Sequence, residues 1–255
     1  MATWLFLRGL TRESAHWGTF VDDFQQQIPG SIVLAIDLPG NGRLNHLASP
    51  ISVGAMLEHC RAELIRQQQK PPLMLLAMSL GAMVAAEWVR RFPEEIAGCV
   101  LINTSFRPFN PFYQRLRPRN YVTLLRMLGL NNVSPAAWER AILHMTSNRP
   151  DQIEEIVRQW IGIRLQRPVR KLEAVRQLVA AARYRASTQK PAVSVLLLAS
   201  ANDQLVDVNC SRVIQARWGC PLQIHETAGH DLPLDDSLWV IWQVRNWLSR
   251  TGLNG

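Results

Sequence analysis

Short apolar runs alternate with helix-like patterns along most of this chain. Six runs have the length and the apolar content that suit strands buried on both faces of a parallel sheet. Between most of them, apolar residues recur at helical spacing. We therefore expect an α/β fold with a doubly wound, mostly parallel sheet of about six strands. The expected strands cover residues 4–7, 32–36, 73–77, 99–102, 193–199 and 222–225.

The segment LLAMSLGAM, Leu75 to Met83, places Ser79 between one of these strands and a helix expected over 80–91. A strand-to-helix turn that exposes a serine hydroxyl needs small residues two positions before and after the serine. Ala77 and Gly81 fill those positions, with alanine replacing the first glycine of the usual Gly-x-Ser-x-Gly pattern. Taken alone, the segment fits a serine that caps a helix about as well as a nucleophile.

A serine nucleophile needs a histidine base and a carboxylate that orients it, and both follow later expected strands. The segment SANDQLV places Asp203 in the loop after the fifth strand, where Asp207 is a competing acid. The segment TAGHDLPLDD places His230 in a glycine-containing loop before a helix over 238–248, whereas the competing His225 lies inside the sixth strand. The chain order serine, aspartate, histidine separates this set from other serine hydrolase arrangements.

With these motifs the sequence resembles the α/β-hydrolase superfamily, from LFLRGL to the final helix. The segments AIDLPGNG (residues 35–42) and INTS (102–105) also resemble family loops. Within the superfamily the chain is most similar to small carboxylesterases of the pimeloyl-carrier-protein methyl ester esterase kind. The resemblance implies a core that lacks the first two strands of the full family sheet, with a helical cap inserted after the fourth strand.

Acyl transfer also requires donors for the oxyanion. The N–H of Leu80, directly after the nucleophile, is one expected donor. The resemblance implies that Leu10, which follows Gly9 in the loop after the first strand, supplies the second. Arg8 stands where the family commonly has histidine, and its side chain is either structural or favours anionic substrates. We expect Arg8, Gly9 and Met78 to contact the substrate, and we expect no metal and no cofactor.

Residues 106–190 interrupt the strand and helix alternation with at least three helical patterns, one of them beginning at Ser134 and Pro135. We interpret this segment as a helical cap over the active site, and residues 1–105 with 191–255 as the core. The cap contains 16 Lys and Arg against 5 Asp and Glu, a net charge of +11, whereas the whole chain carries +8. No nucleic-acid motif accompanies this charge.

Length and cysteine content are compatible with a single enzyme domain. A chain of 255 residues can form one large core. No charged leader precedes the first expected strand, and no apolar run approaches the roughly 20 residues of a membrane span. The four cysteines have neither metal-site nor disulfide-framework spacing. We therefore expect a soluble cytoplasmic protein with reduced thiols at Cys60, Cys99, Cys210 and Cys220.

Two classes of function remain open from the sequence. The first is a serine hydrolase that cleaves a small acyl ester or thioester through an acyl-enzyme on Ser79; lactonases, C–C hydrolases and haloperoxidases share the same scaffold. The second is a catalytically idle hydrolase fold that acts as a binding or regulatory protein. The basic cap suggests an acidic acyl carrier protein as partner. The alternative is a solvated cationic surface, or loose attraction to nucleic acid or anionic lipid. The arginines considered for that docking are Arg115, Arg117, Arg119, Arg158, Arg164 and Arg167.

Overall fold

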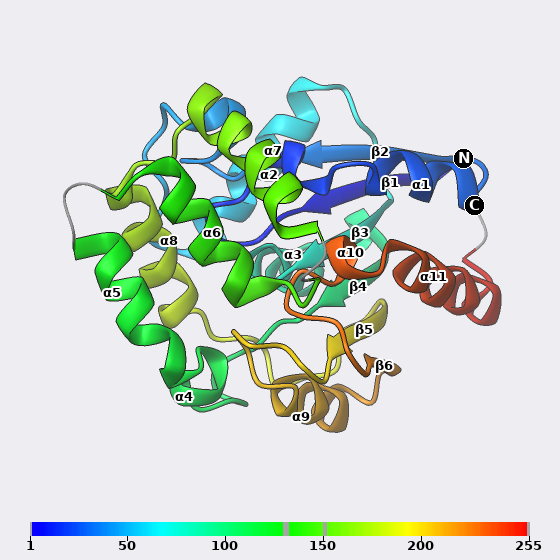
Figure 1. The fold of residues 1–255 in the computed structure, drawn as a ribbon. Coiled ribbons are helices and arrows are strands. Elements are labelled where there is room, and N and C mark those ends of the chain that lie inside the picture. The colour runs from blue at the N-terminus through cyan, green and yellow to red at the C-terminus, as the bar shows by residue number, and fades with distance from the viewer. Residues whose placement is uncertain (1, 130–132, 150–151, 254–255) are drawn as a thin grey trace.

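The computed structural model describes residues 2–129, 133–149 and 152–253. Six parallel strands form one sheet in the order β2-β1-β3-β4-β5-β6, which confirms the predicted α/β class (Figure 1). Because β1 has β2 on one side and β3 on the other, the winding direction changes beside β1, where α/β sheets open a crevice at their carboxyl edge. The strands are β1 (Ala2–Leu7), β2 (Ser31–Ile36), β3 (Leu73–Met78), β4 (Ile96–Ile102), β5 (Ser194–Ser200) and β6 (Leu222–His225).

Alternate side chains of each central strand supply two hydrophobic layers, because successive residues of a strand point to opposite faces. Trp4 and Phe6 pack in one layer with α1 (Phe20–Gln27) and α11 (Ser237–Thr251). Leu5 and Leu7 pack in the other layer with α2 (Val53–Arg66), α3 (Leu80–Arg91) and α9 (Asn209–Trp218). Full burial of such a side chain contributes about 1.5–3 kcal/mol to the free energy of folding. The two layers therefore stabilise the sheet that carries the loops at its carboxyl edge.

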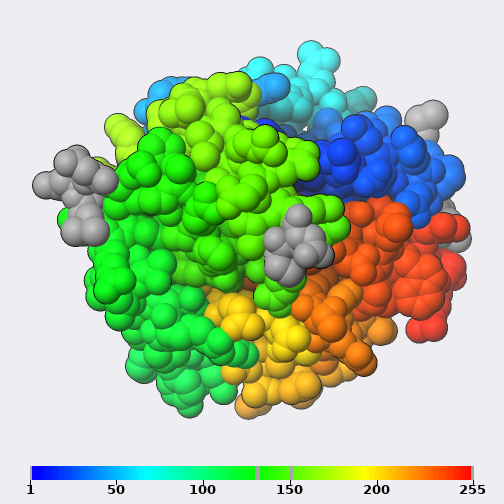
Figure 2. Space-filling model, viewed as in Figure 1, coloured from blue at the N-terminus to red at the C-terminus, as the bar shows by residue number. Residues whose placement is uncertain are grey.

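Between β4 and β5 the chain forms the helical insertion, which we define as residues 106–190. Its helices lie beside the sheet in Figure 1, and their side chains cover the left half of the face shown in Figure 2. Ser134 accepts a hydrogen bond from the N–H of Ala137 and Pro135 is the first helical residue, as expected. The described helices are α4 (Phe112–Arg115), α5 (Tyr121–Gly129), α6 (Pro135–Thr146), α7 (Ile153–Gln166) and α8 (Lys171–Arg183).

Buried polar contacts attach the insertion to the loop that follows β1. Arg12 Nη1 lies 2.6 Å from Glu139 Oε2 of α6, and the Arg12 guanidinium stacks over the ring of Trp160, 3.8 Å from its centroid. Next to it, Arg167 Nη1 lies 2.7 Å from Glu13 Oε1. Burial of a charge costs desolvation free energy unless the charge is paired. The insertion is therefore held in the position on the sheet where these pairs form.

The four cysteines are free and buried. No helix among the described residues is long and apolar enough to cross a membrane. Burial raises the pKa of the Cys60 thiol to about 12, so this thiol stays protonated near neutral pH. The cysteines therefore act as apolar packing residues.

Candidate active site

Ser79 occupies the sharp turn between β3 and α3 with a strained backbone, φ 52° and ψ −116°. A non-glycine residue holds such a conformation only when its surroundings impose it, as at many functional sites. Its N–H donates to the carbonyl of Ile102 at 3.0 Å, which fixes the turn against the end of β4. Its side chain makes no capping hydrogen bond to α3, so the capping alternative lacks the contact that would define it.

Two glycines allow the backbone to approach this turn closely. A Cβ added to Gly81 would lie 2.5 Å from the carbonyl oxygens of both Leu7 and Arg8, so α3 begins in direct contact with the end of β1. A Cβ added to Gly9 would lie 3.2 Å from Cβ of Ser79. The loop that carries Gly9 and Leu10 therefore lies against the serine.

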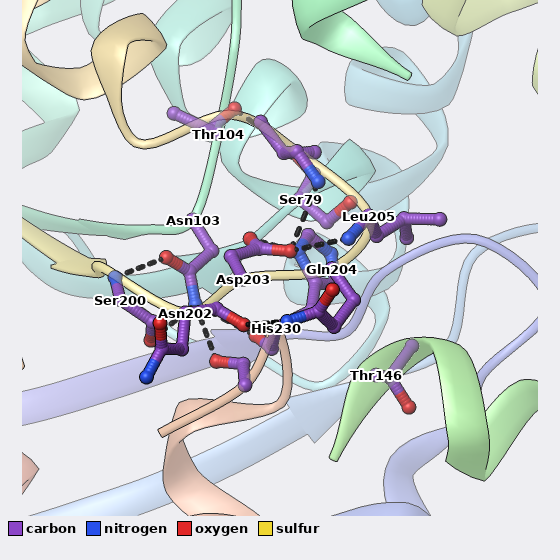
Figure 3. A network of polar contacts seen from close by, with 12 residues as sticks. Ser79, Asn103, Thr104, Thr146, Ser200, Asn202, Asp203, Gln204, Leu205 and His230 are labelled. Atoms are coloured by element: carbon purple, nitrogen blue, oxygen red, sulfur yellow. Dashed lines mark hydrogen bonds and ion pairs between the residues drawn. The ribbon is translucent and has the colours of Figure 1, made fainter. Parts of the chain in front are cut away.

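Asp203 and His230 lie together, buried, at the same edge of the sheet (Figure 3). His230 Nδ1 is 2.6 Å from Asp203 Oδ2. The other carboxylate oxygen of Asp203 accepts the N–H groups of Leu205 at 2.7 Å and Val206 at 2.9 Å. These two bonds fix the carboxylate in the loop after β5, and the carboxylate in turn fixes the imidazole.

The two competing residues have other partners. Asp207 accepts the N–H of Asn209 at 2.9 Å and lies 3.4 Å from the guanidinium of Arg117. His225 Nε2 lies 3.1 Å from Asp236 Oδ2, and its Nδ1 accepts two backbone N–H groups of the following loop. Both side chains thus stabilise loops, and neither bonds to Asp203 or His230.

Asn103, at the end of β4, links the loops of the site and was not singled out from the sequence. Its Nδ2 donates to the carbonyl of His230 at 2.8 Å and to Ser200 Oγ at 3.1 Å, and its Oδ1 accepts the N–H of Ser200 at 2.8 Å. The residue has a positive φ of 45°. Asparagine tolerates this conformation better than most residues, which is the one local signal that its position offers.

Arg8 is buried and forms two hydrogen bonds to Asp231, the residue after His230. Nη1 lies 3.0 Å from Oδ1 and Nη2 lies 2.5 Å from Oδ2, and the guanidinium stacks over Trp17. This paired arrangement compensates the charge of Arg8. The structure therefore favours the structural interpretation of Arg8 over recognition of an anionic substrate, and it identifies Asp231 as the partner that sequence reasoning missed.

Ser79, His230 and Met78 line a cavity of about 800 Å³ between the sheet and the insertion, together with Arg8, Gly9 and Leu10. The insertion contributes an apolar wall to the same cavity. Among the other apolar residues of the insertion, Leu125 is exposed, whereas Ile156 and Trp160 pack inside the insertion's own cluster. The wall includes Tyr121, Leu124, Met127, Leu128, Trp138 and Ile142.

A buried histidine lies behind the loop that follows β1. The N–H of Glu13 donates to His16 Nδ1 at 3.1 Å, which requires an unprotonated nitrogen there. Burial, followed by the charge of Arg12, lowers the pKa of His16 well below its ordinary value. Among the described residues, no group of three or more His, Cys, Asp or Glu side chains is arranged to hold a metal ion.

The chain is similar to known hydrolases. A family model described as serine aminopeptidase, S33 matches residues 1–237. No protein with a curated description matches the sequence. Among solved structures, an esterase from Exiguobacterium antarcticum has a TM-score of 0.79 at 12% identity, covering 98% of this chain and 92% of that chain.

Two further solved structures share the fold. An esterase from Thermogutta terrifontis, with malate bound, has a TM-score of 0.75 at 18% identity, with coverage of 98% and 90%. The 2-hydroxy-6-oxo-6-phenylhexa-2,4-dienoate hydrolase of Rhodococcus sp. strain RHA1 has a TM-score of 0.76 at 17% identity, with coverage of 100% and 91%. At these identities the likeness is one of fold, and the chemistry has to be argued from the site.

Proposed function

Because the chain belongs to the α/β-hydrolase family described as serine aminopeptidase, S33, we propose that it is a serine hydrolase that cleaves carboxylic esters or thioesters. The observation that carries this proposal is that a strained Ser79 and His230 line one cavity, and that His230 is bonded to Asp203. A serine, a base and an acid from three strand ends in this order are the requirements for nucleophilic acyl transfer.

In the proposed mechanism Ser79 Oγ attacks the carbonyl carbon while His230 Nε2 takes the hydroxyl proton. Asp203 holds Nδ1–H and stabilises the imidazolium that forms. The N–H groups of Leu10 and Leu80 donate to the oxyanion. Leu80 is the first residue of α3, and the first N–H groups of a helix have no partner within it. His230 then protonates the departing alcohol or thiol. Water, activated by His230, releases the acid from Ser79.

The charges around the cavity favour an ester over the free amino terminus of a peptide. Among the described residues that line the cavity, Asp231 is the single carboxylate, and Arg8 already pairs with it. An α-ammonium group would therefore be desolvated here without a free counter-ion, at a cost of several kcal/mol. The apolar wall supports an acyl chain as the group that fills the cavity.

A panel of p-nitrophenyl esters, acyl thioesters and amino-acid p-nitroanilides tests the proposal. Ester turnover should fall by several powers of ten in Ser79→Ala and in His230→Ala, because members of such a set act as a unit. His225→Ala is the matched control and should change turnover far less. Preferred cleavage of the anilides, or full turnover in either site variant, would reject the proposal. Absence of all turnover, together with no labelling of Ser79 by a fluorophosphonate, would favour the idle binding protein.

Acyl-chain length gives a second measurement of the same proposal. We expect kcat/KM to rise from acetyl to octanoyl esters, because each methylene buried against the apolar wall contributes about 0.8 kcal/mol. Equal values along the series would remove the acyl pocket from the proposal. A Leu125→Ser variant, which changes an exposed side chain of the same helix, is the control for nonspecific effects on α5.

Docking of an acidic acyl carrier protein stays a prediction. Fewer arginines of the insertion are available for it than the net charge of the sequence suggests. Three of the six arginines considered for it have ion-pair partners: Arg117, Arg164 and Arg167 pair with Asp207, Glu139 and Glu13. The other three donate to uncharged oxygens. These contacts are Arg115 to Ala181 O, Arg119 to Gln204 Oε1 and Arg158 to Glu154 O.

A further inference from the structure

Three arginines from separate segments of the insertion line the cavity that contains Ser79. Arg107 lies in the loop after β4, Arg115 ends α4, and Arg185 follows α8. A backbone bridge aligns Arg107 with Arg185, and the N–H of Ala186 donates to the carbonyl of Arg107 at 2.7 Å. The fold therefore brings three positive charges, distant in sequence, to one part of the cavity wall.

These charges have no carboxylate partner among the described residues, in contrast to Arg8 and Arg12 of the same cavity, which are ion-paired. Arg107 and Arg115 each donate to the carbonyl of Ala182 at 3.4 Å, and Arg115 also donates to Ala181 O at 2.5 Å. Their guanidinium groups consequently share one acceptor at the carboxyl end of α8.

Stabilisation of that helix end does not account for the whole cluster. A helix carboxyl terminus carries about half of a negative charge, against three guanidinium groups. Each guanidinium offers five N–H donors, and the carbonyl contacts use only some of them. Arg115 Nε has no partner among the described residues, as is also true of Nε in the ion-paired Arg8 and Arg12. Burial, followed by the like charge of Arg107, lowers the pKa of Arg115, so its charged form is partly desolvated at the cavity wall.

We propose that Arg107, Arg115 and Arg185 form a binding site for an anionic group, a carboxylate or a phosphate, which the substrate carries on an aliphatic chain away from the scissile ester. The planar guanidinium fork matches both groups by paired hydrogen bonds. The apolar wall of the insertion accommodates the chain. The site assigns a substrate class, amphiphilic anionic esters, and in this respect it rests on the proposed function.

Calorimetric titration of the full chain tests the site without any turnover. The probes are octyl phosphate, octanoate, 1-octanol and inorganic phosphate. Octyl phosphate or octanoate should bind at least about tenfold more tightly than both 1-octanol and inorganic phosphate, since charge-assisted hydrogen bonds add to chain burial. The stronger of the two anions identifies the headgroup. Equal affinity for 1-octanol and both anions would overturn the proposal.

Variants locate the binding. The double variant Arg107→Gln and Arg185→Gln changes exposed side chains, so the fold should be retained. It should lower the ratio of anion affinity to octanol affinity about tenfold. The matched control is Arg126→Gln on α5, an exposed arginine that does not line the cavity, and its ratio should equal that of the wild type. An unchanged ratio in the double variant, or an equal loss in the control, would overturn the site.

The same titration in Ser79→Ala separates this inference from the proposed function. Selective anion binding that persists there supports the site independently of turnover. If the wild-type protein also binds the anions selectively but hydrolyses none of the esters, the site stands and ester hydrolysis is rejected. Ester hydrolysis by the wild-type protein without selective anion binding would support the proposed function and reject the anion site. For the active enzyme, p-nitrophenyl esters with and without a terminal carboxylate should differ mainly in KM, and this difference should shrink in the double variant.

Discussion

Replacement of Asp203 by asparagine should separate the proposed catalytic contribution of this buried carboxylate from its structural contribution. The N–H groups of Leu205 and Val206 donate to one oxygen, and an asparagine oxygen can accept both. The amide NH₂ then occupies the position of Oδ2, 2.6 Å from His230 Nδ1, where it donates a hydrogen bond. His230 would carry its proton on Nε2, so it could not accept the proton of Ser79.

The expected effects differ greatly in size. Exchange of one charge-assisted hydrogen bond for a neutral one should lower the free energy of unfolding by about 1–2 kcal/mol. Reversal of the histidine tautomer costs about 10⁴-fold in kcat in serine proteases, equivalent to about 5.4 kcal/mol of activation free energy. Asp203→Asn should therefore remain folded and lose almost all ester hydrolysis.

Urea unfolding and kcat/KM for p-nitrophenyl butyrate measure these two quantities. Asp207→Asn is the matched control, because Asp207 is half-buried, pairs with Arg117 and competes for the same role in the sequence. It should stay within about twofold of the wild-type rate. If Asp203→Asn retained more than a tenth of the activity, or Asp207→Asn lost it instead, the assignment of the acid would be wrong.

Three further changes test the surroundings of the site. Gly81→Ala should lower the free energy of urea unfolding by about 1–3 kcal/mol, because its Cβ would meet two carbonyl oxygens at 2.5 Å; wild-type stability would refute the close contact. Arg8→Met should cost about 3–5 kcal/mol by leaving Asp231 buried and unpaired, and Asp231→Leu in the same chain should recover part of it; no recovery would argue against the pair. Since the pKa of His16 is lowered by burial, the unfolded chain binds a proton first as the pH falls below about 6.5, and stability falls by up to about 1.4 kcal/mol per pH unit. His16→Asn should remove that part of the slope between pH 7 and 5.5, and identical slopes would contradict it.

The strands and the turn at Ser79 were predictable because their signals are local. Each of the three proposed catalytic residues lies in the turn or loop that follows an apolar run, so the end of a run indicated where to look for the side chain. The largest difference is in β4, which begins at Ile96 rather than at residue 99. Gly98 interrupts the apolar run, so the sequence pattern does not indicate that the strand begins before it. A glycine is needed at this position because a Cβ there would lie 2.8 Å from the ring of Trp247.

The contacts that compensate charge were not predictable. Arg8 and Asp231 are 223 residues apart, and Arg12 and Glu139 are 127 apart. Such pairs follow no period, so the sequence supplied the net charge of the insertion but not the identity of its neutralised arginines. The distinction between Arg167, which pairs with Glu13, and Arg185, which has no carboxylate partner in the described part of the chain, required coordinates.

The role of Asn103 bears on the order in which the protein folds. Its side chain bonds to residues 97 and 127 positions later in the chain, at Ser200 and His230. Contacts between residues so far apart in sequence form slowly, because the chain loses conformational entropy on loop closure before the contact contributes to stability. During synthesis the turn at Ser79 can form long before His230 leaves the ribosome. We therefore expect the contacts of Asn103 with Ser200 and His230 to form late, after the turn at Ser79.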